Sequence, residues 1–458
     1  MNTETIDKFS AGHRGAVLGA GHPDYEEARK LYNGMIDKHP LMIARCSDVG
    51  DVIDAVNFGR DNKLAIAIRG GGHNGPGFGS VDGGLVIDMS TMKGVRVNPA
   101  ARTVRVGPGC TTGDVDHATY AFGQAVPFGI VSTTGVAGLT LSGGHGYLSR
   151  QYGLAIDSLI EADVVLADGS FVTASETQNA DLLWALRGGG GNFGVVTSFL
   201  FRTHPAKDVY GGPIVFDLSD AATVMRWYRQ FQASAPNDFC IWLGLQTVLR
   251  TEPFPQEHWG KRMCVLLVAH NGEGAQAAVN AIRQDLPTPL FDWAGPIPYP
   301  ALQSMFDALF PKGLQWYWKG DFVKSLPDAA IDAHIAHATR VPSDECVMHL
   351  YPIDGAVHDK EKGDTAWNCR DATWSMVIAA VSPEPGNSAA LKKWAKDYWQ
   401  DVHPYDLDGA YPNFMMDDEG EGRLRATYGD NYPRLAALKR KFDPNNLFHV
   451  NQNVRPAN

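Results

Sequence analysis

The sequence predicts an α+β protein built from two regions with different patterns. Up to about His204, helical and strand-like segments alternate in short units that are interrupted by glycine-rich stretches. From about Ala206 to Asp406, well-separated strand candidates have helical stretches between them, which is typical of a mainly antiparallel sheet with helices on one face. The chain shows no internal repeat, and its 458 residues leave ample material for large hydrophobic cores.

Composition and charge exclude several classes of partner. The chain has 44% hydrophobic and 20% charged residues, a net charge of −11 and a pI near 5.7. An acidic protein of this kind is not expected to bind nucleic acid or an anionic membrane, because both need basic patches. No stretch approaches the roughly 18 apolar residues of a membrane span, and the N-terminus lacks the apolar segment of a secretory signal. We therefore expect a cytoplasmic protein, whose oligomeric state the sequence does not indicate.

The cysteines give no sign of a metal site or a disulfide framework. The six cysteines are scattered and form no Cys-x-x-Cys pair, so we predict buried, small hydrophobic residues and no metal.

The first elements follow from caps and periodicity. Asp24 is predicted to cap a helix through about Asp37, and Leu41–Arg45 is predicted to be a strand. Ser47 is predicted to cap a second helix, because apolar residues recur after it with the 3.6-residue period, at Val49, Val52, Ile53 and Val56. The apolar run Leu64–Ile68 then predicts a short buried strand.

That strand leads into Arg69-Gly-Gly-Gly-His-Asn74, the most informative stretch of the chain. Glycines leave backbone N–H groups without side chains in front of them, and such a loop can cradle a pyrophosphate. Gly70-x-Gly72-x-x-Gly75 does not fit the dinucleotide fingerprint, because Pro76 and the glycines beyond it prevent the required helix. A phosphate-bearing ligand is therefore one reading, and a tight turn is the alternative.

A second glycine stretch and several later elements can also be predicted. Gly189-x-Gly191-x-x-Gly194 leads into the strand-like run 195–201, so it is not a dinucleotide fingerprint either. Asp168-Gly169 predicts the turn of a hairpin over 162–173. The strand candidates of the middle region are Cys240–Leu245, Met263–Ala269, Tyr317–Val323, Val347–Pro352 and Ser375–Ala380, and its helical stretches include Ala221–Gln232, Ala275–Arg283 and Ala389–Trp399.

Six ordered motifs together resemble one family. They are Arg69–Asn74, Asp82–Ser90, Gly135–Arg150, Asp181–Val196, Tyr411–Phe414 and Phe442–Asn453. In this order they resemble the FAD-binding oxidases of the vanillyl-alcohol-oxidase (PCMH-type FAD-binding) fold, in the berberine-bridge-enzyme-like branch. The resemblance implies a two-subdomain FAD-binding domain over 1–205, an inserted substrate domain over 206–406 and a C-terminal return to the FAD-binding domain over 407–458.

The resemblance also implies how FAD is held. In the family, the histidine that corresponds to His73 is bonded to the 8α-methyl carbon of the flavin. Many members have a second link from a cysteine, whose position is Val131 here, so we expect a single covalent link, at His73. Cys110 lies outside that motif and is the less favoured substitute.

Further cofactor contacts are implied at positions that match the motifs, although a glycine there could equally serve packing. These residues are Arg69, Gly70, Gly71, Gly72, Asn74, Val131, Gly135, Gly138, Gly143, Gly144, Gly194, Val196, Asn413, Asn451 and Asn453.

Hydride transfer from an alcohol to a flavin needs a base for the accompanying proton. Tyr411 lies in the Tyr-x-Asn motif that faces the flavin in the family. His145 replaces an aromatic or aliphatic residue of the glycine motif, and imidazole titrates near neutrality. Either residue could be the base, or could merely pack. His349 and Tyr351 share one face of a strand candidate and are expected, with Tyr317 and Lys319, to line the substrate pocket.

The leading hypothesis is an FAD-dependent oxidase that takes hydride from an alcohol, hemiacetal or related C–H centre of a small organic molecule, such as a sugar or secondary metabolite. Dioxygen is the expected acceptor, because Thr134 lies where valine leaves the flavin accessible to oxygen in the family and leucine closes it. The alternatives are a dehydrogenase with another acceptor and a flavin-loaded binding protein without turnover.

Overall fold

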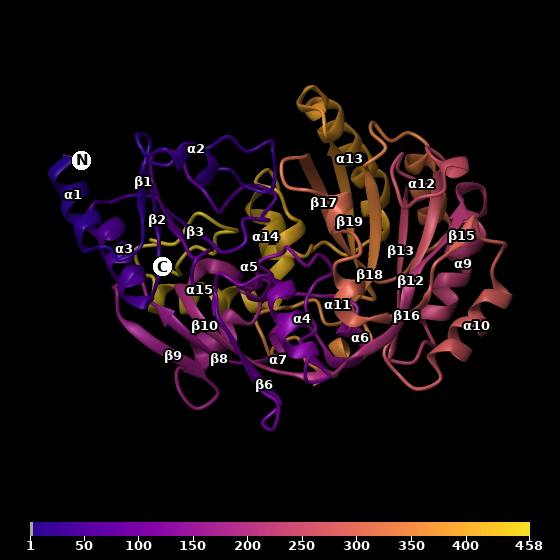
Figure 1. The fold of residues 1–458 in the computed structure, drawn as a ribbon, viewed down its shortest axis with the longest axis horizontal. Helices are drawn as coiled ribbons and strands as arrows, with labels where there is room; N and C mark the ends of the chain where they lie inside the picture. The colour runs from indigo at the N-terminus through magenta and orange to yellow at the C-terminus, as the bar shows by residue number, and fades with distance from the viewer. Residues whose placement is uncertain (1–2) are drawn as a thin grey trace.

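The computed structural model describes residues 3–458, which form two halves side by side (Figure 1). The N-terminal part of the chain forms one half, and a large sheet from the middle of the chain forms the other. The C-terminal helices α14 (Gly420–Tyr428) and α15 (Tyr432–Phe442) lie back in the first half. The α+β fold predicted from the sequence is therefore observed.

The first subdomain is a four-stranded sheet with the order β1-β2-β4-β3. Its strands are β1 (Val17–Gly19), β2 (Met42–Arg45), β3 (Ile66–Arg69) and β4 (Leu85–Asp88). Helix α3 (Val49–Asp61) packs apolar residues against the sheet. Its N-cap is Asp48, whose side chain accepts from the N–H groups of Gly50 and Asp51, so the predicted cap at Ser47 is wrong by one residue.

The helix predicted from Asp24 to Asp37 is also wrong beyond its first turn. In this segment only α2 (Tyr25–Ala28) is an α-helix, and Asp24 makes no side-chain cap; helix α1 (Thr3–Gly12) lies before it. The chain leaves the helical path because its next residues are held by the rest of the molecule. Asn33 Nδ2 donates to the carbonyl oxygens of Gly75 (2.7 Å) and Trp316 (3.0 Å). Tertiary contacts thus override the local preference of this segment for helix.

The second subdomain is a five-stranded antiparallel sheet with the order β5-β6-β10-β8-β9. Its strands are β5 (Val95–Asn98), β6 (Thr103–Val106), β8 (Leu159–Val165), β9 (Phe171–Ser175) and β10 (Val195–Arg202). The predicted hairpin is β8 and β9, with Gly169 at φ +84° in the turn. Its helices are α4 (Thr112–Tyr120), α5 (Val136–Leu141), α6 (Ser149–Tyr152), α7 (Ala155–Ser158) and α8 (Ala180–Leu186), and β7 (Gln124–Ala125) pairs with β11 (His204–Pro205).

The second half is an eight-stranded sheet that runs β15-β12-β14-β13-β18-β19-β17, with β16 paired to β12. The strands are β12 (Asp208–Asp217), β13 (Phe239–Thr247), β14 (Arg262–His270), β15 (Phe291–Asp292), β16 (Gly295–Pro298), β17 (Gln315–Val323), β18 (Val347–Pro352) and β19 (Trp374–Ser382). All five predicted strands are confirmed. The strand β12 and the helix α12 (Asp328–Ala338) were not predicted.

Helices cover one face of this sheet, and the other face turns toward the first half (Figure 1). The covering helices are α9 (Ala221–Gln232), α10 (Ala275–Asp285), α12 and α13 (Ser388–Val402). The short helix α11 (Tyr299–Gln303), between β16 and β17, packs against α4 of the first half. Within residues 3–458 no helix is long and apolar enough to cross a bilayer, and the six cysteines are free and buried.

Candidate active site and cofactor cavity

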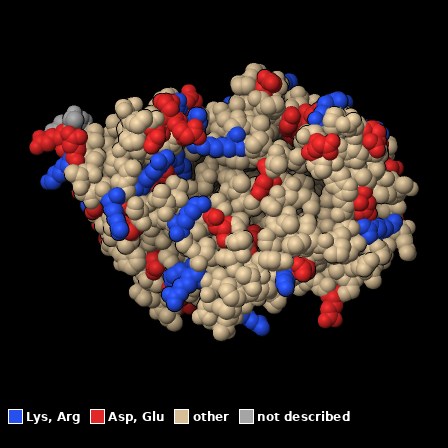
Figure 2. Space-filling model, in the orientation of Figure 1, with Lys and Arg blue, Asp and Glu red and all other residues tan. Residues whose placement is uncertain are grey.

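One cavity of about 670 Å³ extends between the two halves. The view in Figure 2 shows this face of the molecule hollowed at the junction, with acidic and basic side chains interspersed around it. The first half contributes the loop after β3, the segment 129–138, the turn 190–194 and the tail 448–452 to the wall. The second half contributes the face of its sheet that is free of helices.

The first-half end of the cavity is built from backbone. None of the N–H groups of residues 70–74 is hydrogen-bonded to an acceptor within residues 3–458. The loop can face the segment 129–138 closely only because both carry glycine. A Cβ atom on Gly71 would lie 2.4 Å from the backbone nitrogen of Gly135, and a Cβ atom on Gly135 would lie 2.3 Å from that of Gly71. Such unpaired donors suit phosphate or carbonyl oxygens.

A buried ion pair holds the opposite wall of this end. Lys439 and Asp443 are 0% exposed, and the Lys439 ammonium donates to Asp443 (2.7 Å) and to the carbonyl oxygens of Asn192 (2.7 Å) and Phe448 (2.8 Å). Asp443 in turn accepts from the Phe448 N–H group. The pair therefore joins the glycine turn 190–192 to the C-terminal tail, two segments that both line the cavity.

The residues present fit FAD. The N–H groups of residues 70–74, Asn451 Oδ1 and the Tyr428 hydroxyl have no hydrogen-bond partner in the described part of the chain. They are polar groups at the cavity that a polar ligand would satisfy. The predicted cofactor residues that line the cavity are Arg69, Gly70, Gly71, Gly72, His73, Asn74, Val131, Gly135, Gly138, Gly194, Val196, Asn413 and Asn451.

Three of the predicted cofactor residues do not line the cavity. Gly143 packs against Trp367, because a Cβ atom there would lie 2.4 Å from the indole ring. Gly144 instead directs its N–H group at the hydroxyl of Tyr411. Asn453 lies outside the wall, and its neighbour Gln452 lines the cavity in its place. For these three residues, the resemblance of the motif did not indicate whether the residue faces the cavity.

His73 is held on two sides. Its ring stacks on Tyr32, with 4.0 Å between ring centroids and 17° between planes, and its Nε2 lies 3.1 Å from Thr133 Oγ1. Burial lowers the pKa of His73 to about 4. The imidazole is therefore neutral at physiological pH.

Val131 and Cys110, the two positions considered for a second covalent link to the flavin, lie in different surroundings. Val131 lines the cavity. The Cys110 thiol lies outside the cavity wall and points at the carbonyl oxygen of Gly94, and burial raises its pKa. Cys110 is therefore in no position to replace a cysteine at residue 131.

The hydroxyl of Tyr411 is held by two hydrogen-bond donors. Its oxygen accepts hydrogen bonds from Asn413 Nδ2 (2.8 Å) and from the Gly144 N–H group (3.2 Å). Burial raises the pKa of Tyr411 to about 12, and the two donors act in the opposite direction because they stabilise the phenolate.

His145 lies beside Tyr411, with 4.6 Å between ring centroids, and is 5.2 Å from Tyr351 by the same measure. Neither ring nitrogen has a partner within residues 3–458. Burial lowers the pKa of His145 to about 3, so the expectation that it titrates near neutrality is wrong. The cause is complete desolvation without a compensating charge.

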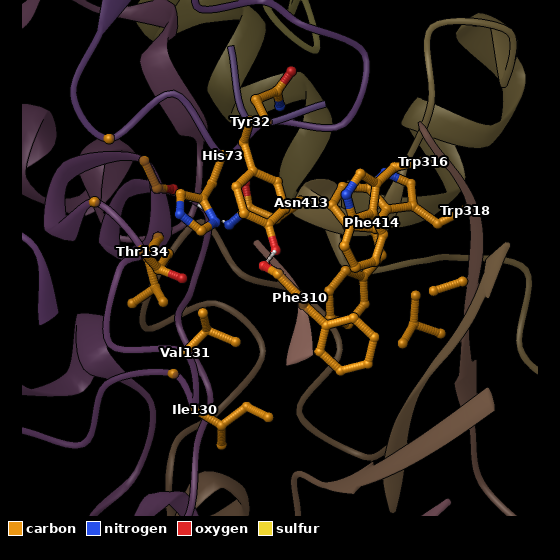
Figure 3. Close-up of a pocket in the computed structure, with 18 of the residues that line it drawn as sticks. Tyr32, His73, Ile130, Val131, Thr134, Phe310, Trp316, Trp318, Asn413 and Phe414 are labelled. Atoms are coloured by element: carbon orange, nitrogen blue, oxygen red, sulfur yellow. Dashed lines mark hydrogen bonds between the residues drawn. The ribbon is translucent and has the colours of Figure 1, made fainter. Parts of the chain in front are cut away.

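Aromatic side chains form the wall that faces the first half. Figure 3 shows Trp316, Trp318 and Phe414 on one side of the cavity and His73 with Tyr32 on the other. On β18, which is separated from β17 by β19, the predicted pair His349 and Tyr351 lines the cavity, with His349 Nδ1 2.7 Å from the Tyr351 hydroxyl.

The prediction that Tyr317 and Lys319 line the pocket is wrong. Both lie on β17, but they point to the face covered by helices. Tyr317 donates to Asp418, and Lys319 donates to Glu419 (2.8 Å). Because successive side chains of a strand alternate between faces, Trp316 and Trp318 are the residues that reach the cavity.

Several residues at the site were not predicted, and they belong to two kinds. Trp316 and Trp318 differ from the chosen residues only by one position in a strand, so alternation alone could have suggested them. Tyr32 and Lys439 lie in no motif that could have pointed to them. Their positions follow from contacts between distant segments of the chain.

A cavity that runs between a two-subdomain glycine-rich half and the open face of an antiparallel sheet defines a flavin-dependent oxidoreductase. A family model described as "FAD binding domain" matches residues 40–175, and one described as "Berberine and berberine like" matches residues 410–455. The chain belongs to the berberine-bridge-enzyme-like family of FAD-linked oxidoreductases.

Individual relatives match over nearly the whole chain. An FAD-linked oxidoreductase of Dictyostelium discoideum is 32% identical over 99% of this chain and 97% of its own. The xylooligosaccharide oxidase of Thermothelomyces thermophilus is 29% identical over 99% of this chain and 94% of its own. The solved structure of Physcomitrella patens BBE-like 1 superposes with a TM-score of 0.87 at 25% identity, and it covers 98% of this chain and 99% of that chain.

Proposed function

We propose that this FAD-linked oxidoreductase is an oxidase that takes hydride from an alcohol or hemiacetal carbon, while Tyr411 accepts the hydroxyl proton. The observation that carries this proposal is the Tyr411 oxygen, which accepts two fixed hydrogen bonds at the cavity wall. Donors fixed in this way stabilise a phenolate, and a phenolate is the form of tyrosine that can take a proton.

When FAD is bound, it accepts the hydride and later returns the two electrons to an acceptor. The unpaired N–H groups of residues 70–74 and the Asn451 side chain would hold it, and His73 would attach it covalently. Because Val131 cannot form a thioether, we propose a single covalent link. Acid denaturation tests this: the yellow colour should stay with the protein, in a peptide that contains His73 and no cysteine-bound flavin.

The wall chemistry disfavours an anionic substrate and favours one with an aromatic or otherwise apolar body. Arg69 is the one lysine or arginine among the described residues that line the cavity, and its guanidinium donates to Asp88 (2.8 Å). An anionic group on the substrate would therefore lack a partner. Trp316, Trp318 and Phe414 provide flat apolar surfaces for such a body.

Anaerobic mixing with a panel of alcohols tests the reaction. Loss of flavin absorbance with aromatic or cyclic secondary alcohols, and a weaker response to oligosaccharides, would support the proposal. Bleaching by dithionite but by no member of a broad panel would instead favour a binding protein without turnover.

Dioxygen is the proposed acceptor, and Thr134, which lines the cavity, supports it because its volume is close to that of valine. Admitting air to the reduced protein should restore the flavin rapidly and give one hydrogen peroxide per flavin. Thr134→Val should reoxidise at a similar rate and Thr134→Leu more slowly. Slow reoxidation in all three proteins would favour a dehydrogenase that uses another acceptor.

A further inference from the structure

A histidine and a tyrosine at the cavity wall fix each other's hydrogen bonds. His349 and Tyr351 lie two residues apart on β18, and both line the cavity. His349 Nδ1 lies 2.7 Å from the Tyr351 hydroxyl, and His349 Nε2 lies 3.4 Å from Gln246 Oε1 on β13. The three side chains therefore form one short chain of hydrogen bonds along the free face of the sheet.

The direction of this chain follows from the protonation of its members. Burial lowers the pKa of His349 to about 4, so the imidazole is neutral at physiological pH and carries a single N–H group. The amide oxygen of Gln246 has only lone pairs, so the N–H group is on Nε2 and donates to it. Nδ1 is then an acceptor. It accepts from the Tyr351 hydroxyl, which keeps its proton because burial raises the pKa of this phenol.

The Tyr351 oxygen still has lone pairs that no protein group uses. It makes no second hydrogen bond within residues 3–458. Two neighbouring rings carry nitrogens that could donate to it, Trp242 at 4.3 Å and His145 at 5.2 Å between ring centroids. None of these nitrogens has a hydrogen-bond partner in the described part of the chain. Because buried polar atoms are normally paired, the Tyr351 oxygen suits a donor on a bound molecule.

Tyr351 lies close to the proposed base. The ring of His145 contacts both tyrosines, with 4.6 Å between centroids to Tyr411 and 5.2 Å to Tyr351. Phe414 also packs on both rings, at 4.9 Å from Tyr411 and 5.8 Å from Tyr351. One small molecule can therefore contact both tyrosines.

We propose that Tyr351 is a specificity-determining residue that accepts a hydrogen bond from a second O–H or N–H group of the substrate, and that His349 is the positioning residue that holds Tyr351 as an acceptor. The inference rests on the proposed function, in which Tyr411 takes the proton of the reacting hydroxyl. It adds the substrate class, an alcohol with a second hydrogen-bond donor. An ether or ketone oxygen in the place of that donor would meet the lone pairs of Tyr351 with its own and bind more weakly.

Pairs of ligands that differ in their donors test this selection. Catechol, resorcinol and hydroquinone place two phenolic groups at three spacings, and in their dimethyl ethers both oxygens can only accept. Binding of each compound to the FAD-loaded protein is measured by calorimetry under nitrogen. The ratio of the Kd of the ether to the Kd of its diphenol reports the selection. Comparing this ratio between proteins cancels the effect of the size of the methyl groups.

The variants separate the two roles. Tyr351→Phe keeps the ring but removes the hydroxyl. His349→Leu removes the acceptor for the Tyr351 proton, whereas His349→Asn keeps an acceptor oxygen near the place of Nδ1. Thermal unfolding of every variant reports whether the fold is intact.

The chain offers a matched control for the loss of the histidine. His334 on α12 and Tyr398 on α13 are a second buried pair, with His334 Nδ1 2.8 Å from the Tyr398 hydroxyl. Neither of them lines the cavity. His334→Leu therefore removes the same kind of hydrogen bond away from the site.

In the wild type, at least one diphenol should bind more tightly than its dimethyl ether. The Kd ratio should fall about fivefold in Tyr351→Phe and in His349→Leu, the factor expected for one hydrogen bond of ordinary strength. It should keep its wild-type value in His349→Asn and in His334→Leu. In turnover, Tyr351→Phe should raise KM for cyclohexanediols about fivefold with little change in kcat, and should leave KM for cyclohexanol as it is.

Two results would overturn the inference. A ratio in Tyr351→Phe that equals or exceeds the wild-type ratio at all three spacings would show that Tyr351 accepts no hydrogen bond from the ligand. A wild-type ratio in His349→Leu would show that His349 does not hold Tyr351 as an acceptor. Failure of every alcohol to reduce the flavin would remove the proposed function, whereas the Kd ratios need no turnover and would still decide the role of Tyr351.

Discussion

The two halves of the molecule line the cavity with different kinds of groups, backbone in one half and side chains in the other. In the FAD-binding half, the wall is largely backbone, because glycines at 70–72 and 135 let two loops approach and leave N–H groups unpaired. In the substrate half, the wall consists of side chains that alternate along strands, such as Trp316 and Trp318. A backbone wall tolerates few residue types and so leaves a motif, whereas a side-chain wall can be built from many sequences.

The halves also use buried lysines differently. Lys439 binds carbonyl oxygens of two cavity-lining segments, so its charge supports the cofactor wall. Lys319 pairs with Glu419 on the face of the sheet away from the cavity, so its charge anchors the start of α14 and not the cavity wall. Burial of a charged residue is therefore no sign by itself that the residue serves the site.

The largest expected effect concerns Tyr411, the proposed acceptor of the substrate proton. Tyr411→Phe should slow anaerobic flavin reduction by about 10²–10⁴-fold while flavin loading stays intact. Because the phenolate is the active form and the pKa of Tyr411 is about 12, the wild-type rate should rise with pH throughout the neutral and alkaline range.

A different dependence of the reduction rate on pH is expected if His145 is the base. Since its pKa is lowered to about 3, His145 stays neutral above that value and would give a flat profile from about pH 5 to 9. A flat profile in the wild type, together with a large loss of rate in His145→Phe, would assign the base to His145 instead.

The next effect tests the support of the cofactor wall. Lys439→Met leaves the Asp443 carboxylate buried without its partner, which should lower the free energy of unfolding by about 3–5 kcal/mol. The flavin absorption spectrum should change as well, because the turn 190–192 and the tail lose their common anchor. Lys393→Met, which removes an exposed ion pair with Asp397, should leave both unfolding and the spectrum as they are.

A smaller effect is expected where the wall is backbone. Gly135→Ala places a Cβ atom 2.3 Å from the Gly71 nitrogen, so the two loops must separate. We expect a loss of about 1–3 kcal/mol of stability and a lower flavin-to-protein ratio after purification. Gly94→Ala, with nothing within 4 Å of the added atom, should keep both. Full flavin loading in Gly135→Ala would show that the close approach of the loops is not needed.

The smallest effect is expected on the helix side of the substrate sheet. Tyr317→Phe removes a hydroxyl that bonds Asp418 away from the cavity, so KM for any substrate found should not change. Trp318→Ala, one residue along the same strand, should raise KM because it removes an aromatic surface at the wall. Equal changes in the two variants would contradict the assignment of faces.

By itself, the sequence determined the α+β class, most strands of the large sheet and the glycine loop around His73. Periodicity, turn residues and glycine clusters are local signals, and they were sufficient there. The sequence also indicated Val131 where a second link would need cysteine. Its resemblance to one family was carried by six motifs, four of which contain glycines.

Only the tertiary structure decided which side chains reach the cavity. The phase of β17 depends on how the strand pairs in the sheet, and a shift of one residue exchanges Tyr317 for Trp318. The end of the helix after Ala28 depends on Asn33 and Tyr32 meeting segments far along the chain. The pKa of His145 depends on burial that no local pattern contains, because desolvation is produced by all the segments that pack around a group at once.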